Sequence, residues 1–147
     1  MKIKLKKRDV IFSKLIRERA NYICEACGVN KRGSPGTLDC AHIVGRRSAA
    51  LRWHPQGAIS LCRSCHLFYT EHPFDWRDWC VDHFGADRVA ELRLIANRPV
   101  KWTSAVREDI YKHYQKELKT METERAKGSG LMIDFEPHKI MHIFSQS

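Results

Sequence analysis

Two matched pairs of cysteines constrain the fold of this chain more than any other feature of its sequence. Cys24 and Cys27 form the first pair, Cys62 and Cys65 form the second, and two residues separate the cysteines within each pair. This spacing lets both thiolates of a pair bind one metal ion from a tight turn, and two such turns complete the tetrahedral four-sulfur shell of structural zinc. Disulfides or buried thiols are the alternatives. We therefore predict a structural Zn²⁺ ion that ties residues 28–61 into a closed unit.

The length of the chain and its first residues restrict its class. With 147 residues, it can form one modest domain with an appended helical part, but not two independent hydrophobic cores. No apolar run is long enough to cross a membrane, and residues 1–8 lack the apolar stretch of a secretory signal. These features predict a cytoplasmic protein with no membrane partner, in a reducing compartment.

Positive charge is concentrated in the half of the chain that carries the cysteine pairs. Residues 1–66 contain 14 Lys or Arg and 4 Asp or Glu, whereas residues 67–147 contain 12 and 13. The first part therefore carries a net charge of +10, and the second carries −1. Each phosphate that a Lys or Arg neutralises releases condensed counterions, so a face with this excess suits a polyanion. We predict nucleic acid as the partner.

Hydrophobic periodicity predicts a mixed α+β fold. Apolar residues recur at helical spacing between residues 10 and 20, and Asp9 stands where an N-cap would lie. Residues 37–44 and 58–61 are typical of short strands, and a helix should follow at 65–71. Helical patterns continue in three later segments, residues 75–84, 86–97 and 103–127. The tail, residues 131–147, has a mixed pattern that fits a strand pair, a partner-binding arm or a segment ordered by packing.

Two strands followed by a helix, with one histidine on the first strand and another at the helix start, resemble the core of HNH nucleases. The resemblance rests on Cys24 with Cys27 and on residues 38–44 (LDCAHIV), 53–57 (WHPQG) and 61–66 (LCRSCH). It covers roughly residues 10–72 and is similar to small phage-type members with a zinc-bound frame, including phage recombination nucleases. The resemblance implies a zinc-stabilised ββα-metal core with an N-terminal helix and C-terminal helices.

The resemblance also implies roles for two histidines. His42 occupies the position of the general base, which in the family takes a proton from the water that attacks phosphorus. His66 occupies the position of a ligand to a single catalytic divalent ion, which would be Mg²⁺ or another ion such as Mn²⁺ or Ni²⁺. The products would carry a 5′-phosphate and a 3′-hydroxyl. Zinc at the cysteines would then be structural only.

The sequence departs from the family pattern at two positions. Many members have an acidic residue or histidine just before the general base as a further metal ligand, and this chain has Ala41. A water, Asp39 or a DNA oxygen would have to replace it, although strand alternation points Asp39 and His42 to opposite faces. The family's asparagine is replaced by Gly57. Gln56 or His54 could orient the base from the same loop, and the alternative for His54 is a surface loop residue.

Basic residues surround the predicted catalytic centre. Arg46 and Arg47 follow the first strand directly, so their guanidinium groups should emerge near the attacked phosphate. An exposed polar loop is the alternative. Four more residues are predicted to bind the DNA backbone: Arg52, Lys31, Arg32 and Arg63. Such contacts hold duplex or branched DNA but read little of its sequence.

Three classes of function follow from these patterns. The first is a metal-dependent DNA endonuclease that acts on branched or recombining phage DNA, in the cytoplasm of a bacterial host if a phage encodes it. The second is a zinc-containing DNA-binding protein with a degenerate HNH site, and the third is a phage or host interaction protein. A homodimer would supply two sites, with the helix at 103–127 as a candidate interface. The predicted division is a nuclease core at 1–72, a helical extension at 73–127 and a tail at 128–147.

Overall fold

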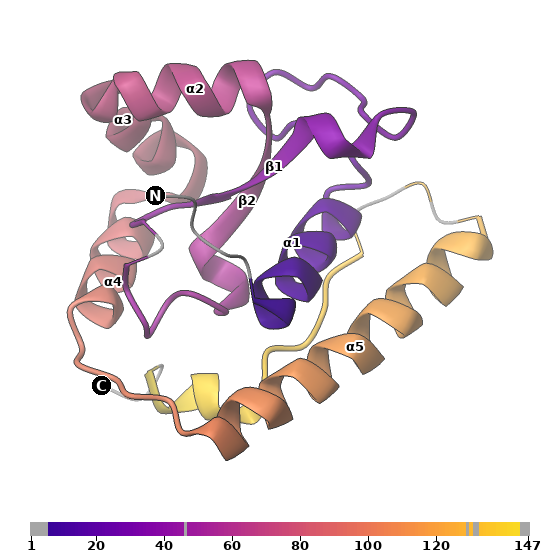
Figure 1. The fold of residues 1–147 in the computed structure, drawn as a ribbon. Coiled ribbons are helices and arrows are strands. Elements are labelled where there is room, and N and C mark those ends of the chain that lie inside the picture. Colours follow the sequence, from indigo (N-terminus) through magenta and orange to yellow (C-terminus); the bar gives the residue numbers. More distant parts are fainter. Residues whose placement is uncertain (1–5, 46, 129, 131–132, 145–147) are drawn as a thin grey trace.

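A computed structural model describes residues 6–45, 47–128, 130 and 133–144, and it shows a mixed α+β fold (Figure 1). Strands β1 (Leu38–His42) and β2 (Ala58–Cys62) form the sheet of the described residues. The strands are antiparallel, and Leu38 lies opposite Cys62 while His42 lies opposite Ala58. This register sets the second cysteine pair at one end of the hairpin and His42 at the other.

The helices lie close to the predicted positions. The first helix begins three residues earlier than predicted, so Asp9 lies inside its first turn and not at the N-cap. From that position, Asp9 Oδ2 accepts a hydrogen bond from the backbone N–H of Lys6 at 3.1 Å. Thr103 caps the last helix, because its hydroxyl accepts a hydrogen bond from Val106 N at 3.2 Å. The helices are α1 (Lys7–Arg19), α2 (Arg63–Glu71), α3 (Pro73–Phe84), α4 (Ala86–Ala96) and α5 (Ser104–Ala126).

Helix α1 is central to the hydrophobic core. It packs against both strands and against α5, and it lies between them in Figure 1. Its apolar face, which includes Phe12, Leu15 and Ile16, is fully buried. Helix α5 contributes a stripe at helical spacing, formed by Ile110, Tyr114, Leu118 and Met121. The helical extension therefore shares one hydrophobic core with the predicted nuclease core.

The described part of the tail packs onto this core and contains no strand. Phe135 is buried, and its ring centroid lies 6.4 Å from that of Phe12 and 5.8 Å from that of Tyr114. His138 is also buried and pairs with Asp109 at 2.7 Å. Within the described ranges, no helix has the length and apolar character needed to span a membrane.

Candidate functional site

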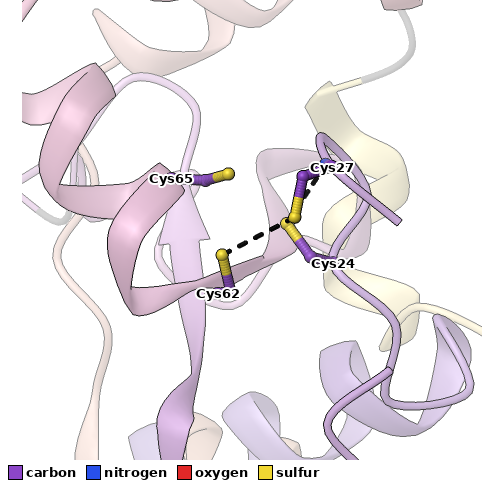
Figure 2. A group of neighbouring side chains, drawn as sticks. All are labelled: Cys24, Cys27, Cys62 and Cys65. Atoms are coloured by element: carbon purple, nitrogen blue, oxygen red, sulfur yellow. Dashed lines mark hydrogen bonds between the residues drawn. The ribbon is translucent and has the colours of Figure 1, made fainter. Parts of the chain in front are cut away.

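The four paired cysteines form one cluster, and Figure 2 shows their sulfurs turned toward one another. Cys24 and Cys27 lie in the turn after α1, while Cys62 ends β2 and Cys65 lies in the first turn of α2. The four Sγ atoms lie within 4.8 Å of one another, and Cys27 Sγ is 3.8 Å from Cys62 Sγ. A tetrahedral zinc site with Zn–S bonds of about 2.3 Å has sulfur–sulfur distances of about 3.8 Å. The cluster is therefore compatible with zinc.

Hydrogen bonds from both the backbone and the side chain of Glu25 hold the first cysteine turn against the sheet. Glu25 N donates to Ser60 O at 2.9 Å, and Glu25 Oε2 accepts from Ser60 N at 2.7 Å. Gly28 closes the turn with φ of +78°, and its N–H donates to Cys24 O at 2.8 Å. No disulfide joins these four cysteines in the structure.

The protein environment lowers the pKa of one thiol in the cluster, Cys24, and raises that of another, Cys65. Burial opposes ionisation of Cys24, but backbone hydrogen bonds from Cys27, Cys62 and Ala26 outweigh it and lower the pKa of this thiol to about 7. Burial and the neighbouring thiols raise the pKa of Cys65 well above its usual range. Four thiolates cannot be adjacent without a cation, so the cluster favours full ionisation only with a metal bound.

His42 is the last residue of β1 and is held by the loop that follows. Its Nε2 lies 3.2 Å from the backbone carbonyl oxygen of Arg52, and its ring centroid lies 6.2 Å from that of Phe12. A carbonyl can only accept a hydrogen bond, so Nε2 must carry the proton in this contact. In the neutral ring, Nδ1 is then the basic nitrogen. The contact with the Arg52 carbonyl therefore selects the tautomer of His42 that is protonated on Nε2.

His66 lies in the first turn of α2 and pairs with Asp39 of β1. The distance from His66 Nδ1 to Asp39 Oδ2 is 3.1 Å, and Arg63 Nη2 contacts the other carboxylate oxygen of Asp39 at 3.1 Å. Because the carboxylate accepts the Nδ1–H, Nε2 is the unprotonated nitrogen of the neutral ring, the one that could bind a metal ion. Histidines that bind metals commonly have such a carboxylate partner, which fixes the tautomer and the ring orientation. Asp39 is thus placed to orient His66.

His42 and His66 line the same small pocket, which has a volume of about 70 Å³. Tyr69, Thr70 and Trp76, which the sequence patterns did not indicate, also line it. Ala41 of β1 also lines this pocket; it is buried, and its side chain has no atom that can bind a metal ion. Among the described residues, the only group of three or more His, Cys, Asp or Glu side chains close enough to share a metal ion is the cysteine cluster. Fewer than three of these described side chains could therefore bind an ion at His66, and water or a phosphate would have to supply its remaining ligands.

The loop between the strands leaves little room for a side chain at Gly57. A Cβ atom on Gly57 would lie 3.0 Å from Leu51 O and 3.3 Å from Leu51 Cβ, so an asparagine does not fit without a shift of the backbone. His54 is buried and not a surface residue, and its Nδ1 accepts a hydrogen bond from Gln56 N at 3.2 Å. His54 lines a different cavity of about 790 Å³ and is not among the described residues that line the small pocket of His42 and His66. Its predicted role beside His42 stays a prediction.

The predicted DNA-binding residues differ in their surroundings. Arg46 lies outside the described residues, and Arg47 is exposed. The guanidinium of Arg52 forms a two-point ion pair with Asp9, at 2.8 and 2.7 Å. Arg63 is exposed but pairs with Asp39 at 3.1 Å.

The two remaining predicted DNA-binding residues, Lys31 and Arg32, follow the first cysteine turn in the sequence and also differ in their surroundings. Arg32 donates to Asn21 Oδ1, and its guanidinium lies 4.7 Å from the centroid of the Tyr22 ring. Lys31 is half-buried. The binding of DNA by these six residues stays a prediction.

Comparisons with known proteins find one short similarity. The chain is 35% identical over 54 residues to the Zorya protein ZorE of Escherichia coli, and the matched stretch is 37% of this chain. It spans only 14% of the length of ZorE. No family model matches the chain. No solved structure matches it either.

Proposed function

We propose that this protein is a metal-dependent DNA endonuclease of the HNH type. The observation that carries the proposal is the contact of His42 Nε2 with the Arg52 carbonyl, in a pocket that His66 also lines. Because the Arg52 carbonyl can only accept, Nε2 of the neutral His42 ring is the donor and Nδ1 is the nitrogen that can accept a proton. Hydrolysis of a phosphodiester requires such a base to take a proton from the attacking water. The concentration of positive charge in residues 1–66 favours DNA as the substrate class.

In this proposal, the two histidines have separate tasks. His42 Nδ1 accepts a proton from the water that attacks phosphorus, and the Arg52 carbonyl keeps the ring in the required tautomer. His66 Nε2 would hold a divalent ion, Mg²⁺, Mn²⁺ or Ni²⁺, while Asp39 orients the ring from the other nitrogen. A divalent ion supplies positive charge that stabilises a phosphate as negative charge develops on it. The 5′-phosphate and 3′-hydroxyl products remain part of this proposal.

Zinc at the cysteine cluster supports the site from outside the pocket. Cys65 directly precedes His66, and Cys62 ends the strand that pairs with β1. A metal ion that joins these residues to the turn after α1 would fix the start of α2 relative to the sheet. We therefore assign zinc a structural role, distinct from the ion at His66.

A DNA-binding protein without turnover is the second candidate function. It is favoured by the presence of Ala41 in the pocket of His66, because this buried residue has no side-chain atom that can bind a metal ion. Such a protein would bind DNA with strong salt dependence and would give no cleavage product with any divalent ion.

Cleavage of plasmid DNA and of branched DNA by the wild type and His42→Ala tests the proposal, in Mg²⁺, Mn²⁺ and Ni²⁺. General bases contribute roughly 10²- to 10⁴-fold to a rate, so we expect a loss of this size with DNA affinity retained. His113→Ala, which changes a histidine on α5 that does not line the small pocket, is the matched control and should cleave normally. Cleavage at the wild-type rate by His42→Ala would contradict the assignment of the base. A wild type that binds DNA without cleaving it would favour the second candidate.

A further inference from the structure

A second pocket, with a volume of about 310 Å³, lies beside the segment that holds His42. None of the described residues that line it is acidic. Two tryptophans, Trp53 and Trp102, form part of its wall. Six of its lining residues are basic: Lys6, Arg8, Arg47, Arg52, Lys101 and Arg107.

These basic residues come from segments far apart in the sequence, and fixed contacts hold the segments together. Trp102, in the segment before α5, donates its indole N–H to Ala49 O at 2.9 Å. Arg107, in the first turn of α5, donates to Trp102 O through Nε at 3.1 Å and Nη2 at 2.8 Å. The segment before α5 is thus tied to the loop between the strands. The pocket is therefore built before any ligand binds.

The positive charge of the pocket exceeds what the surrounding carboxylates neutralise. Asp9, which is buried and is not among the residues that line the pocket, pairs with Arg52. In contrast, Arg8 Nε is buried and has no hydrogen-bond partner among the described residues, while the Arg8 guanidinium lies 5.6 Å from the centroid of the Trp53 ring. A buried N–H group without an acceptor is unfavourable, and the positive charge of Arg8 is not compensated by a hydrogen-bonded carboxylate at Nε. The exposed residues Arg47 and Lys101 add charge at the rim.

We propose that this basic pocket binds a backbone phosphate of DNA, at a place separate from the pocket of His42 and His66. The inference rests on the proposed function, because it identifies how the same substrate is held. Arg52 connects the two places, because its carbonyl oxygen contacts His42 and the same residue is part of the lining of the basic pocket. A DNA strand held here would pass next to His42. Contacts of this kind position the backbone and do not read bases.

The salt dependence of DNA binding tests the inference. The double variant Arg47→Gln with Lys101→Gln removes two exposed charges from the pocket, and Lys116→Gln with Lys119→Gln removes two exposed charges from α5 outside it. Binding of a fluorescent 30-base-pair duplex, of roughly the length that several phosphate contacts need, is measured from low to moderate salt. The slope of log K against log salt should become shallower by about 1 for each phosphate that the pocket variant no longer neutralises. The control variant should keep the wild-type slope, and thermal melts should show that both variants are folded.

Equal slopes for the wild type and the pocket variant would overturn the inference. Thermal melts with inorganic pyrophosphate distinguish a DNA phosphate from a small phosphorylated molecule. Stabilisation of the wild type but not the pocket variant, with equal DNA slopes, would assign the pocket to the small molecule and overturn the DNA assignment. A shallower slope in the pocket variant, together with a wild type that never cleaves, would support the pocket while refuting the nuclease.

Discussion

The stability of this protein should fall in mild acid because of one buried histidine, His54. Burial lowers the pKa of His54 from its ordinary value of 6.5 to about 4, and the positive charges of Arg88 and His142 add to this effect. Its Nδ1 accepts a hydrogen bond from Gln56 N, a contact that the neutral ring makes and the doubly protonated ring cannot. His54 is therefore neutral in the folded protein near pH 5, while the same side chain is protonated in the unfolded chain.

The sign and size of the effect follow from these two pKa values. Between pH 6.5 and pH 4, the unfolded chain binds more protons than the folded protein, so the free energy of unfolding falls as the pH falls. The difference between 6.5 and about 4, at 1.36 kcal/mol for each pH unit, gives a total loss of about 3 kcal/mol. About 2 kcal/mol of this loss should already be present at pH 5.

Denaturant unfolding of the wild type and His54→Asn, each at pH 7 and pH 5, measures the effect. The asparagine oxygen can accept the Gln56 N–H, but asparagine does not titrate. The cysteine cluster titrates in both proteins, so the difference between them isolates His54. We expect the wild type to lose about 2 kcal/mol more than the variant between the two pH values. Equal losses in the two proteins would refute a buried, neutral His54.

Three further predictions concern other parts of the molecule. Cys65→Ser should abolish binding of one zinc ion per chain, measured by atomic absorption, and should remove cooperative unfolding, whereas Cys40→Ser, outside the cluster, should retain the metal. Asp39→Asn should weaken Mn²⁺ binding by about 10- to 100-fold in a titration, since His66 loses its orienting carboxylate; unchanged affinity would contradict that role. Asp9→Asn should lower the free energy of unfolding by about 2–4 kcal/mol, because it leaves the partly buried Arg52 without its counter-charge, and a loss below about 1 kcal/mol would show that this pair is dispensable.

Local patterns in the sequence were sufficient to predict the elements and the cysteine cluster. The helical spacing of apolar residues around Phe12 and Leu15 predicted α1. The two-residue spacing within each cysteine pair predicted that two turns would bring four sulfur ligands together. Strand alternation also separated Asp39 from His42, and in the structure Asp39 pairs with His66 while His42 lies near Phe12. These predictions depend on neighbours within a few residues, which a sequence shows directly.

Contacts between distant residues could not be predicted in the same way. The sequence indicated Arg52 as a phosphate ligand, but its pairing with Asp9 joins residues 43 positions apart and depends on how α1 packs against the loop. The register of the strands, which places Asp39 near the start of α2, was also not visible in the pattern. Arg47 and Arg52 of the basic pocket were predicted to bind DNA, but its other basic residues were not, since Lys6 and Lys101 line one pocket only in the folded chain.

The packing of α1 against α5 has a consequence for how the protein is synthesised. Tyr114 of α5 is buried against Phe12, at 5.8 Å between ring centroids, and its hydroxyl donates to Trp53 O. A ribosome must therefore complete about a hundred residues after Phe12 before α5 covers the part of the apolar face of α1 that the two strands leave open. Until then, an emerging chain exposes that face, which is the condition in which chaperones bind and aggregation begins. For the same reason, a fragment limited to residues 10–72 should be insoluble or poorly folded, even though it contains every cysteine and histidine of the candidate site.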